Sequence, residues 1–119
     1  MATLNAHTFS TRDIAEAHYL GLVDVWAAEK RRIDPAQEAI YRRKSMEAEA
    51  GAGSLIEAEA IALGIEKSDL CLRINAASAE KERLWSDIEI QRITAKSNIR
   101  NAATAANMHS IYQQLTGED

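Results

Sequence analysis

The feature that most constrains this chain is a run of 52 residues, from Ile65 to Thr116, that contains neither Gly nor Pro. Gly64 precedes this run and Gly117 follows it. Because residues that favour helix dominate the run, the sequence predicts a long helix here. A continuous helix of this length would span about 78 Å, whereas a compact chain of this size has a radius of gyration of about 13–14 Å. The run is therefore either broken, or the protein is extended and depends on partner chains.

The apolar pattern of the run leaves that choice open. Most of its large apolar residues recur at steps of three, four or seven, which is typical of one buried helix face. The stripe changes face within the segment 101–107, so either a kink or short loop lies there, or one helix has two contact faces. The predicted helix-packing residues are Leu70, Ile74, Leu84, Trp85, Ile88, Ile93, Ile99 and Ile111.

Capping patterns predict the remaining helices. Asp34 followed by Pro35 is typical of a helix start, and Ser54 begins a second capping pattern that ends at Glu57. The sequence therefore predicts one all-α domain over residues 1–119, with three shorter helices and one long, kinked or straight C-terminal helix. Its parts are an irregular arm over 1–9 and helices over 10–33, 35–50, 54–63 and 68–116.

The apolar residues of the chain are unusually small. There are 22 Ala residues, and Phe, Trp and Tyr together number six. Helices lined with Ala approach closely but bury little area each, so a lone monomer would gain little stability from burial. This composition favours protein partners, either in a homo-oligomer or in a larger assembly.

Charge is distributed unevenly along the chain. The formal net charge of −4 argues against a general nucleic-acid-binding protein. Six cations nevertheless flank the turn at Asp34, and these cations are candidates for contact with an anion or an acidic partner. Ordinary solvated helix ends would explain them as well. This predicted basic corner consists of Lys30, Arg31, Arg32, Arg42, Arg43 and Lys44.

No motif of enzymes, metal sites or cofactor sites is present in the sequence. His7, His18 and His109 are scattered, and none is paired at helical spacing with another His or with Cys71. There is no Gly-rich phosphate loop and no nucleophile motif. We therefore expect no catalytic residue, no metal and no cofactor. The N-terminus has no signal-peptide pattern and no apolar run could span a membrane, so we expect a cytoplasmic protein at synthesis.

The segment from Ala60 to Leu70 resembles a helix-turn-helix core. Ala60, Gly64 and Leu70 occupy the expected small, turn and apolar positions. Glu59 and Arg73 stand where apolar residues are expected, and Arg73 is the one early cation of the would-be reading helix. A helix–turn–helix corner without DNA binding is the simpler interpretation.

The wider segment 58–106 resembles the small internal virion (ejection) and head–tail structural proteins of tailed phages. The likeness lies in Ala-rich helices interrupted between Gly64 and Ser68, followed by a long helix rich in Glu, Gln, Arg and Ala. It covers less than half of the chain and includes no invariant motif. The resemblance implies a virion subunit that becomes ordered on assembly and that catalyses no reaction.

Three functional hypotheses follow. The leading one is a non-enzymatic structural or assembly subunit that packs through long Ala-rich helices in a virion or another multi-copy complex. The second is a small helix-turn-helix DNA-binding regulator that uses residues 55–76. The third is an acidic inhibitor or adaptor that binds another protein through residues 47–59.

Overall fold

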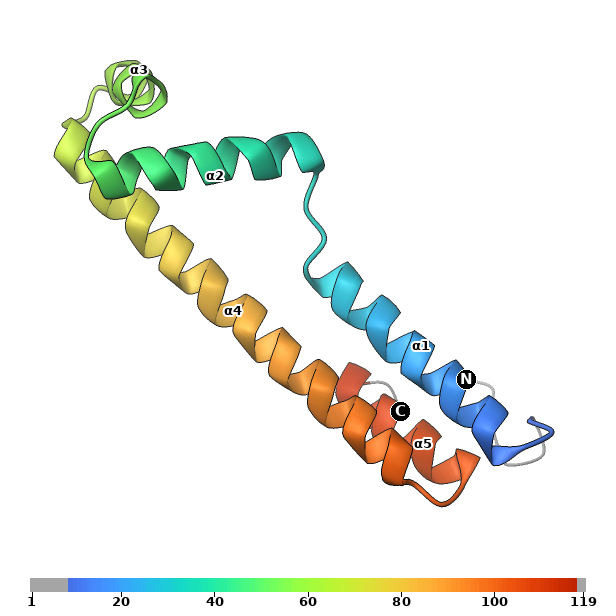
Figure 1. Cartoon of the computed structure of the whole chain (residues 1–119). Coiled ribbons are helices and arrows are strands. Elements are labelled where there is room, and N and C mark those ends of the chain that lie inside the picture. Colours follow the sequence, from blue (N-terminus) through green and yellow to red (C-terminus); the bar gives the residue numbers. More distant parts are fainter. Residues whose placement is uncertain (1–8, 118–119) are drawn as a thin grey trace. The chain divides into compact units, whose positions relative to one another are not determined.

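The computed structural model describes residues 9–117, and its regular structure is entirely α-helical over that range (Figure 1). This confirms the predicted fold class. The predicted arm over 1–9 lies outside the described residues except for Phe9. The helices are α1 (Arg12–Lys30), α2 (Pro35–Ala50), α3 (Ser54–Leu63), α4 (Lys67–Asn101) and α5 (Ala105–Thr116).

Local capping explains where the shorter helices begin and end. The Thr11 side chain accepts a hydrogen bond from the backbone N–H of Ile14, and Asp34 accepts one from Gln37 with Pro35 in the first turn. Gly51, at a φ of 76°, ends α2 in the left-handed conformation that glycine adopts without strain. The observed starts of α2 and α3, at Pro35 and Ser54, coincide with the predicted ones.

The long run of residues without Gly or Pro is broken into two helices. The predicted helix over 68–116 ends at Asn101, and α5 begins at Ala105, inside the segment where the apolar stripe changes face. Thr104 caps α5 by accepting a hydrogen bond from Asn107. The Arg12 guanidinium donates to the carbonyl oxygens of Arg100 and Ala102, at 2.6 and 2.9 Å. A side chain from α1 thus satisfies carbonyl groups that the end of α4 leaves without helical partners.

The chain divides into two compact units, whereas the sequence predicts one domain. The first, which we call the terminal unit, consists of residues 1–32 and 86–119, and the second, the central unit, consists of residues 33–85. The boundary falls within α4, which therefore contributes residues to both units. We describe each unit separately.

The terminal unit has a closed core between α1, the C-terminal part of α4 and α5. Figure 1 shows α1 running alongside that part of α4, and α5 turning back after the break. Tyr19, Ile99 and Met108, one from each helix, are fully buried. The C-terminal half of the chain is therefore not a solitary rod, because α1 and α5 cover the end of α4.

The central unit has a smaller core between α2, α3 and the start of α4. Ile56 is its one fully buried large side chain among the described residues, and Ala48, Ala60, Leu70 and Cys71 surround it. Three of these neighbours are small, as the Ala-rich composition leads one to expect. No helix within residues 9–117 combines the length and the hydrophobicity that a membrane span requires.

Candidate protein-binding groove

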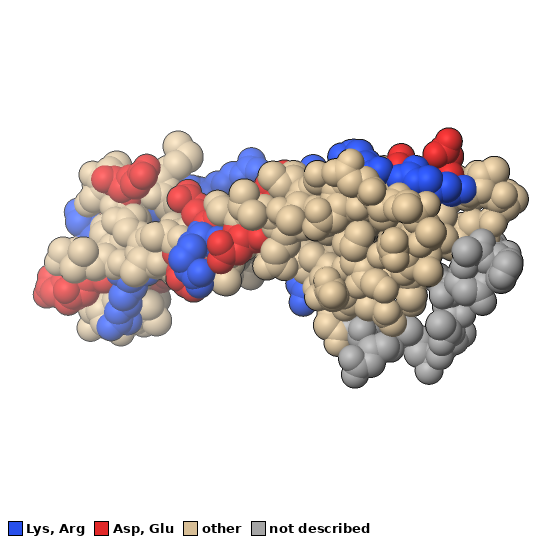
Figure 2. Space-filling model, turned by 90° about the horizontal axis from the view of Figure 1, so that it is seen from below, with Lys and Arg blue, Asp and Glu red and all other residues tan. Residues whose placement is uncertain are grey.

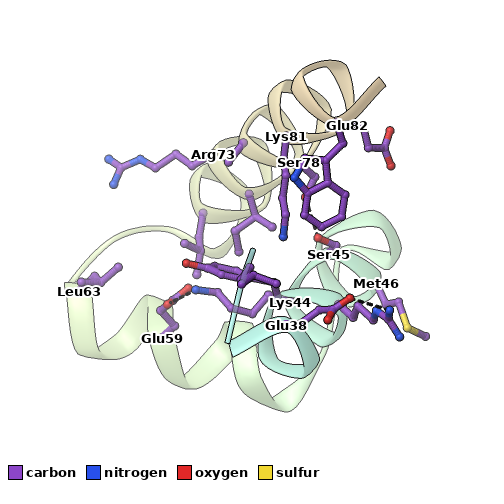
Figure 3. A pocket seen from close by; sticks show the side chains of 17 residues that line it. Glu38, Lys44, Ser45, Met46, Glu59, Leu63, Arg73, Ser78, Lys81 and Glu82 are labelled. Atoms are coloured by element: carbon purple, nitrogen blue, oxygen red, sulfur yellow. Dashed lines mark hydrogen bonds and ion pairs between the residues drawn. The ribbon is translucent and has the colours of Figure 1, made fainter. Parts of the chain in front are cut away.

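An open groove lies in the central unit, between α2, the end of α3 and the first half of α4 (Figure 3). Its volume is about 900 Å³, and its lining is mostly apolar. We call it the α2–α4 groove. Its apolar lining consists of Ile33, Tyr41, Met46, Leu63, Leu70, Ile74, Ala77 and Trp85.

Several of the large apolar side chains that line the groove are in contact with solvent. Met46 is 71% exposed, Leu63 is 58% exposed and Tyr41 is 46% exposed. Below them, Leu70 is buried and Ile74 is half-buried, so the floor is continuous with the core of the unit. Monomeric soluble proteins seldom leave apolar side chains gathered in this way, unless another molecule covers them.

Two polar contacts join the helices that form the groove. The hydroxyl groups of Ser45 and Ser78 are hydrogen-bonded at 2.6 Å, linking α2 to α4. Lys44 donates to Oε1 of Glu59 at 2.6 Å, linking α2 to α3. The second carboxylate oxygen, Oε2 of Glu59, is buried and has no hydrogen-bond partner among the described residues. These two contacts therefore hold α2 against α3 and α4 around the groove.

Lys81 projects into the groove between two aromatic rings. Its Nζ lies 4.8 Å from the ring centroid of Tyr41 and 4.5 Å from that of Trp85. Both distances are within the range of a cation–π interaction. In Figure 3, Lys81 points into the groove, whereas Arg73 and Glu82 extend away from its centre. The apolar surface thus has charged residues at its margin.

The predicted helix-packing residues fall into three groups in the structure. Leu70 and Ile99 are buried in the cores of the central and terminal units. Leu84 and Ile93 are 48% and 46% exposed, so they face away from both cores. The remaining four are half-buried: Ile74 and Trp85 line the α2–α4 groove, Ile111 packs against the terminal core, and Ile88 is the fourth.

The half of the basic corner that lies in the central unit is neutralised by neighbouring acids. Arg42 donates to Glu38 at 2.8 Å, and both residues are in α2. Arg43 donates to Glu47 at 2.8 Å and to Ser54 at 2.7 Å. Lys44 has its partner in α3, as described above. Each of these three cations therefore has a nearby carboxylate.

The other half of the basic corner belongs to the terminal unit. Nη1 of Arg31 lies 3.7 Å from Oε1 of Glu89, and Nη1 of Arg32 lies 3.5 Å from Oε2 of Glu29. Lys30 has no carboxylate within ion-pair distance in the part of the chain that the structure describes. Because acids accompany five of the six cations, the surface offers less uncompensated charge to a phosphate than the sequence suggests.

The helix-turn-helix resemblance corresponds to a real corner between α3 and α4. Gly64 ends α3 at a φ of 68°, and α4 begins at Lys67. Lys67 lies 3.6 Å from Glu57, and Asp69 occupies the first turn of α4. A DNA-reading helix needs uncompensated donors near its N-terminus, and Arg73 is the exposed cation without an ion pair there among the described residues.

The acidic segment 47–59 contains a cap that sequence reasoning missed. Gly53 precedes α3, and Ser54 makes no side-chain capping bond. Instead, Oε1 of Glu47 accepts hydrogen bonds from the backbone N–H groups of Leu55 and Ile56, at 2.9 and 3.0 Å. The bond from Ile56, followed by that from Arg43, holds the pKa of the Glu47 carboxyl below its usual range. No local pattern predicts this cap, because it depends on how α3 turns back against α2.

The terminal unit contains a polar contact between a buried tyrosine and a half-buried histidine. The Tyr19 hydroxyl lies 3.1 Å from Nδ1 of His109, in hydrogen-bond contact, and burial raises the pKa of Tyr19. Nε2 of His109 is buried and has no hydrogen-bond partner among the described residues. The pair joins α1 to α5 within the terminal unit.

The described residues contain no group of three or more His, Cys, Asp or Glu side chains that could hold a metal ion. Comparison of the chain with protein-family models, with curated proteins and with solved structures finds no match. The proposals below therefore depend on the sequence and on the geometry of the two units.

Proposed function

We propose that this protein is a non-enzymatic assembly subunit, and that its α2–α4 groove binds an amphipathic helix of a partner protein. The observation that supports this proposal is the open apolar surface of the groove, with Met46, Leu63 and Tyr41 largely in solvent. Burying such side chains against a partner is favourable by about 25 cal/mol per Å² of apolar surface. A helix that inserts its apolar face into a groove is a recurrent mode of peptide recognition.

The dimensions of the groove suit one helix. The α4 residues that line it extend from Leu70 to Trp85, a helical length of about 23 Å. A helix of about four turns would cover this length, and it would place apolar residues at steps of three, four and seven against the floor.

The setting that we propose is a virion or another multi-copy complex. The support for that setting is the resemblance of residues 58–106 to internal virion and head–tail proteins. A subunit of this kind needs protein-binding surfaces and no catalytic centre. The helix-turn-helix regulator is a competing class, and the experiment below distinguishes the two.

Tryptophan fluorescence tests the proposal directly, because Trp85 lines the groove. In a Trp26→Phe background, Trp85 is the one remaining tryptophan. The chain would be titrated with a synthetic amphipathic helix of about 16 residues, long enough to cover the groove. The control peptide has the same composition in an order that scatters its apolar residues. Saturable binding of the first peptide alone is the expected result.

Two variants and one competing ligand complete the test. Met46→Lys places a charge on the exposed wall of the groove and should weaken peptide binding at least tenfold, whereas Arg83→Ala, outside the groove on the same helix, should not. Equal binding of both peptides, or unchanged binding by Met46→Lys, would overturn the proposal. Binding to duplex DNA that persists at physiological salt and is lost in Arg73→Ala would favour the regulator instead.

A further inference from the structure

We infer that a second copy of this chain docks on a face of the terminal unit that is formed by uncharged residues of the C-terminal part of α4 and of α5. This inference concerns another unit than the α2–α4 groove and does not depend on the function proposed for that groove. The face contains a shallow depression of about 320 Å³ between the two helices. We call it the amide face, and it consists of Ile90, Gln91, Thr94, Asn98, Ile111, Gln114 and Leu115.

Charge is unevenly distributed over the surface of the terminal unit. Helix α5 contains no Lys, Arg, Asp or Glu along its whole length. The nearest cations of α4, Arg92 and Lys96, point instead to α1, where both pair with Asp24 at about 3 Å. Figure 2 shows a wide tan area over the terminal unit, with both basic and acidic side chains at its margin. Depletion of charge is typical of the core of a protein interface.

The chemistry of the amide face favours another copy of this chain as the partner. Across a two-fold axis the same patch meets itself, so like charges near the axis would repel. Amides and hydroxyls each donate and accept hydrogen bonds, so they can pair with identical groups. The side chains of Gln91, Asn98 and Gln114 make no hydrogen bond to the rest of residues 9–117. Their polar groups are therefore available to the same groups of a second copy.

The amide face also contains apolar side chains. Ile90 is 59% exposed, although it lies beside the depression. Ile111 and Leu115 form the opposite wall and are continuous with the buried core of the terminal unit. An apolar side chain of the second copy would fit into this depression. The amide face thus offers both apolar area and polar groups that are compatible with themselves.

The oligomeric state of the full chain tests this inference. Light scattering or sedimentation should show a dimer that dissociates on dilution within the range of about 1 µM to 1 mM. Asn98→Lys should shift the mass to that of a monomer, and Ala28→Lys should not, because Ala28 is an exposed residue of α1 outside the amide face. Asn98→Asp should also be monomeric, and an equimolar mixture of the Lys and Asp variants should recover the dimer.

The opposite outcomes are equally clear. A wild-type monomer at all concentrations would overturn the inference. So would a dimer that Asn98→Lys leaves intact, or one that Met46→Lys in the other unit abolishes. Circular dichroism of each variant would verify that the helices are retained, so that a loss of dimer is assigned to the surface and not to unfolding.

Discussion

The two units of this protein are both built from α-helices, but they differ in how completely they bury their large apolar side chains. In the terminal unit, Tyr19, Val23, Ile99 and Met108 are fully buried, and each packs against neighbours from the other helices. In the central unit, Ile56 alone among the large side chains reaches the same burial, while the walls of the α2–α4 groove remain exposed.

This difference follows from the sizes of the side chains. Tyr, Ile and Met fill the space between three helices, whereas the Ala residues of α2 and α3 leave the space beside α4 open. Close packing of large side chains supplies most of the stability of a small domain, so the terminal unit should be the more stable. The central unit is then the part that gains most from a partner.

The largest expected effect comes from shortening a core residue in each unit. Ile99→Ala should lower the free energy of unfolding by about 2–5 kcal/mol, because it leaves a cavity at a fully buried position. Ile74→Ala should cost less, since Ile74 is half-buried beside the groove. Urea denaturation followed by circular dichroism measures both. If both variants lost the same free energy of unfolding, the two units would not differ in how tightly these side chains are packed.

The buried hydroxyl of the terminal unit provides a second contrast. Tyr19→Phe removes the group that meets Nδ1 of His109 and should cost about 1–3 kcal/mol, because the half-buried imidazole loses its partner. Tyr41→Phe, at an exposed position of the central unit, should leave the free energy of unfolding nearly unchanged. The same denaturation assay compares the two. A neutral Tyr19→Phe would show that the hydrogen bond adds nothing to the terminal core.

Helix caps give a smaller contrast. Thr104→Ala removes the cap of α5 and should cost about 1 kcal/mol. Ser54→Ala should change the free energy of unfolding by less than about 0.5 kcal/mol, because Ser54 does not cap α3. Thermal unfolding by circular dichroism measures both. If Ser54→Ala lost more free energy of unfolding than Thr104→Ala, Ser54 would cap α3 after all, as the sequence predicts.

The smallest effect is the dependence of stability on pH at Glu47. The pKa of the Glu47 carboxyl is lower in the folded state than in the unfolded state. Its contribution to stability is therefore complete when the pH is above the unfolded-state pKa of this carboxyl, and it is lost as the pH falls through the folded-state pKa. Glu47→Gln should therefore lower the melting temperature at neutral pH, and its difference from wild type should shrink as the solution is acidified.

A neighbouring substitution sharpens the test at Glu47. A Cβ atom on Gly53 would collide with the side chain of Glu47, so Gly53→Ala should displace the carboxylate and reproduce the effect of Glu47→Gln. In the terminal unit, hydrogen bonds and charge from Lys96 and Arg92 lower the pKa of Asp24. Asp24→Asn should therefore also lower the melting temperature at neutral pH, and its difference from wild type should also shrink as the solution is acidified. A constant difference between Glu47→Gln and wild type at every pH would exclude the assigned cap.

Sequence reasoning located the helices well and the contacts poorly. Asp34, Pro35 and Gly64 act within one or two turns, so their effects can be inferred from neighbours in the chain. The contacts of Arg12 with the end of α4 join residues about 90 positions apart, and no local pattern predicts them. The groove was likewise missed, although Ile74 and Trp85, which line it, are among the predicted helix-packing residues.

The amino-acid sequence by itself determined that this protein is all-α and where most of its helices begin and end, because capping and helix propensity are local properties. The tertiary structure decided that α4 ends at Asn101, that Glu47 caps α3, and that one unit closes while the other stays open. These outcomes depend on which side chains meet across helices, and burial between distant segments is a property of the packed chain.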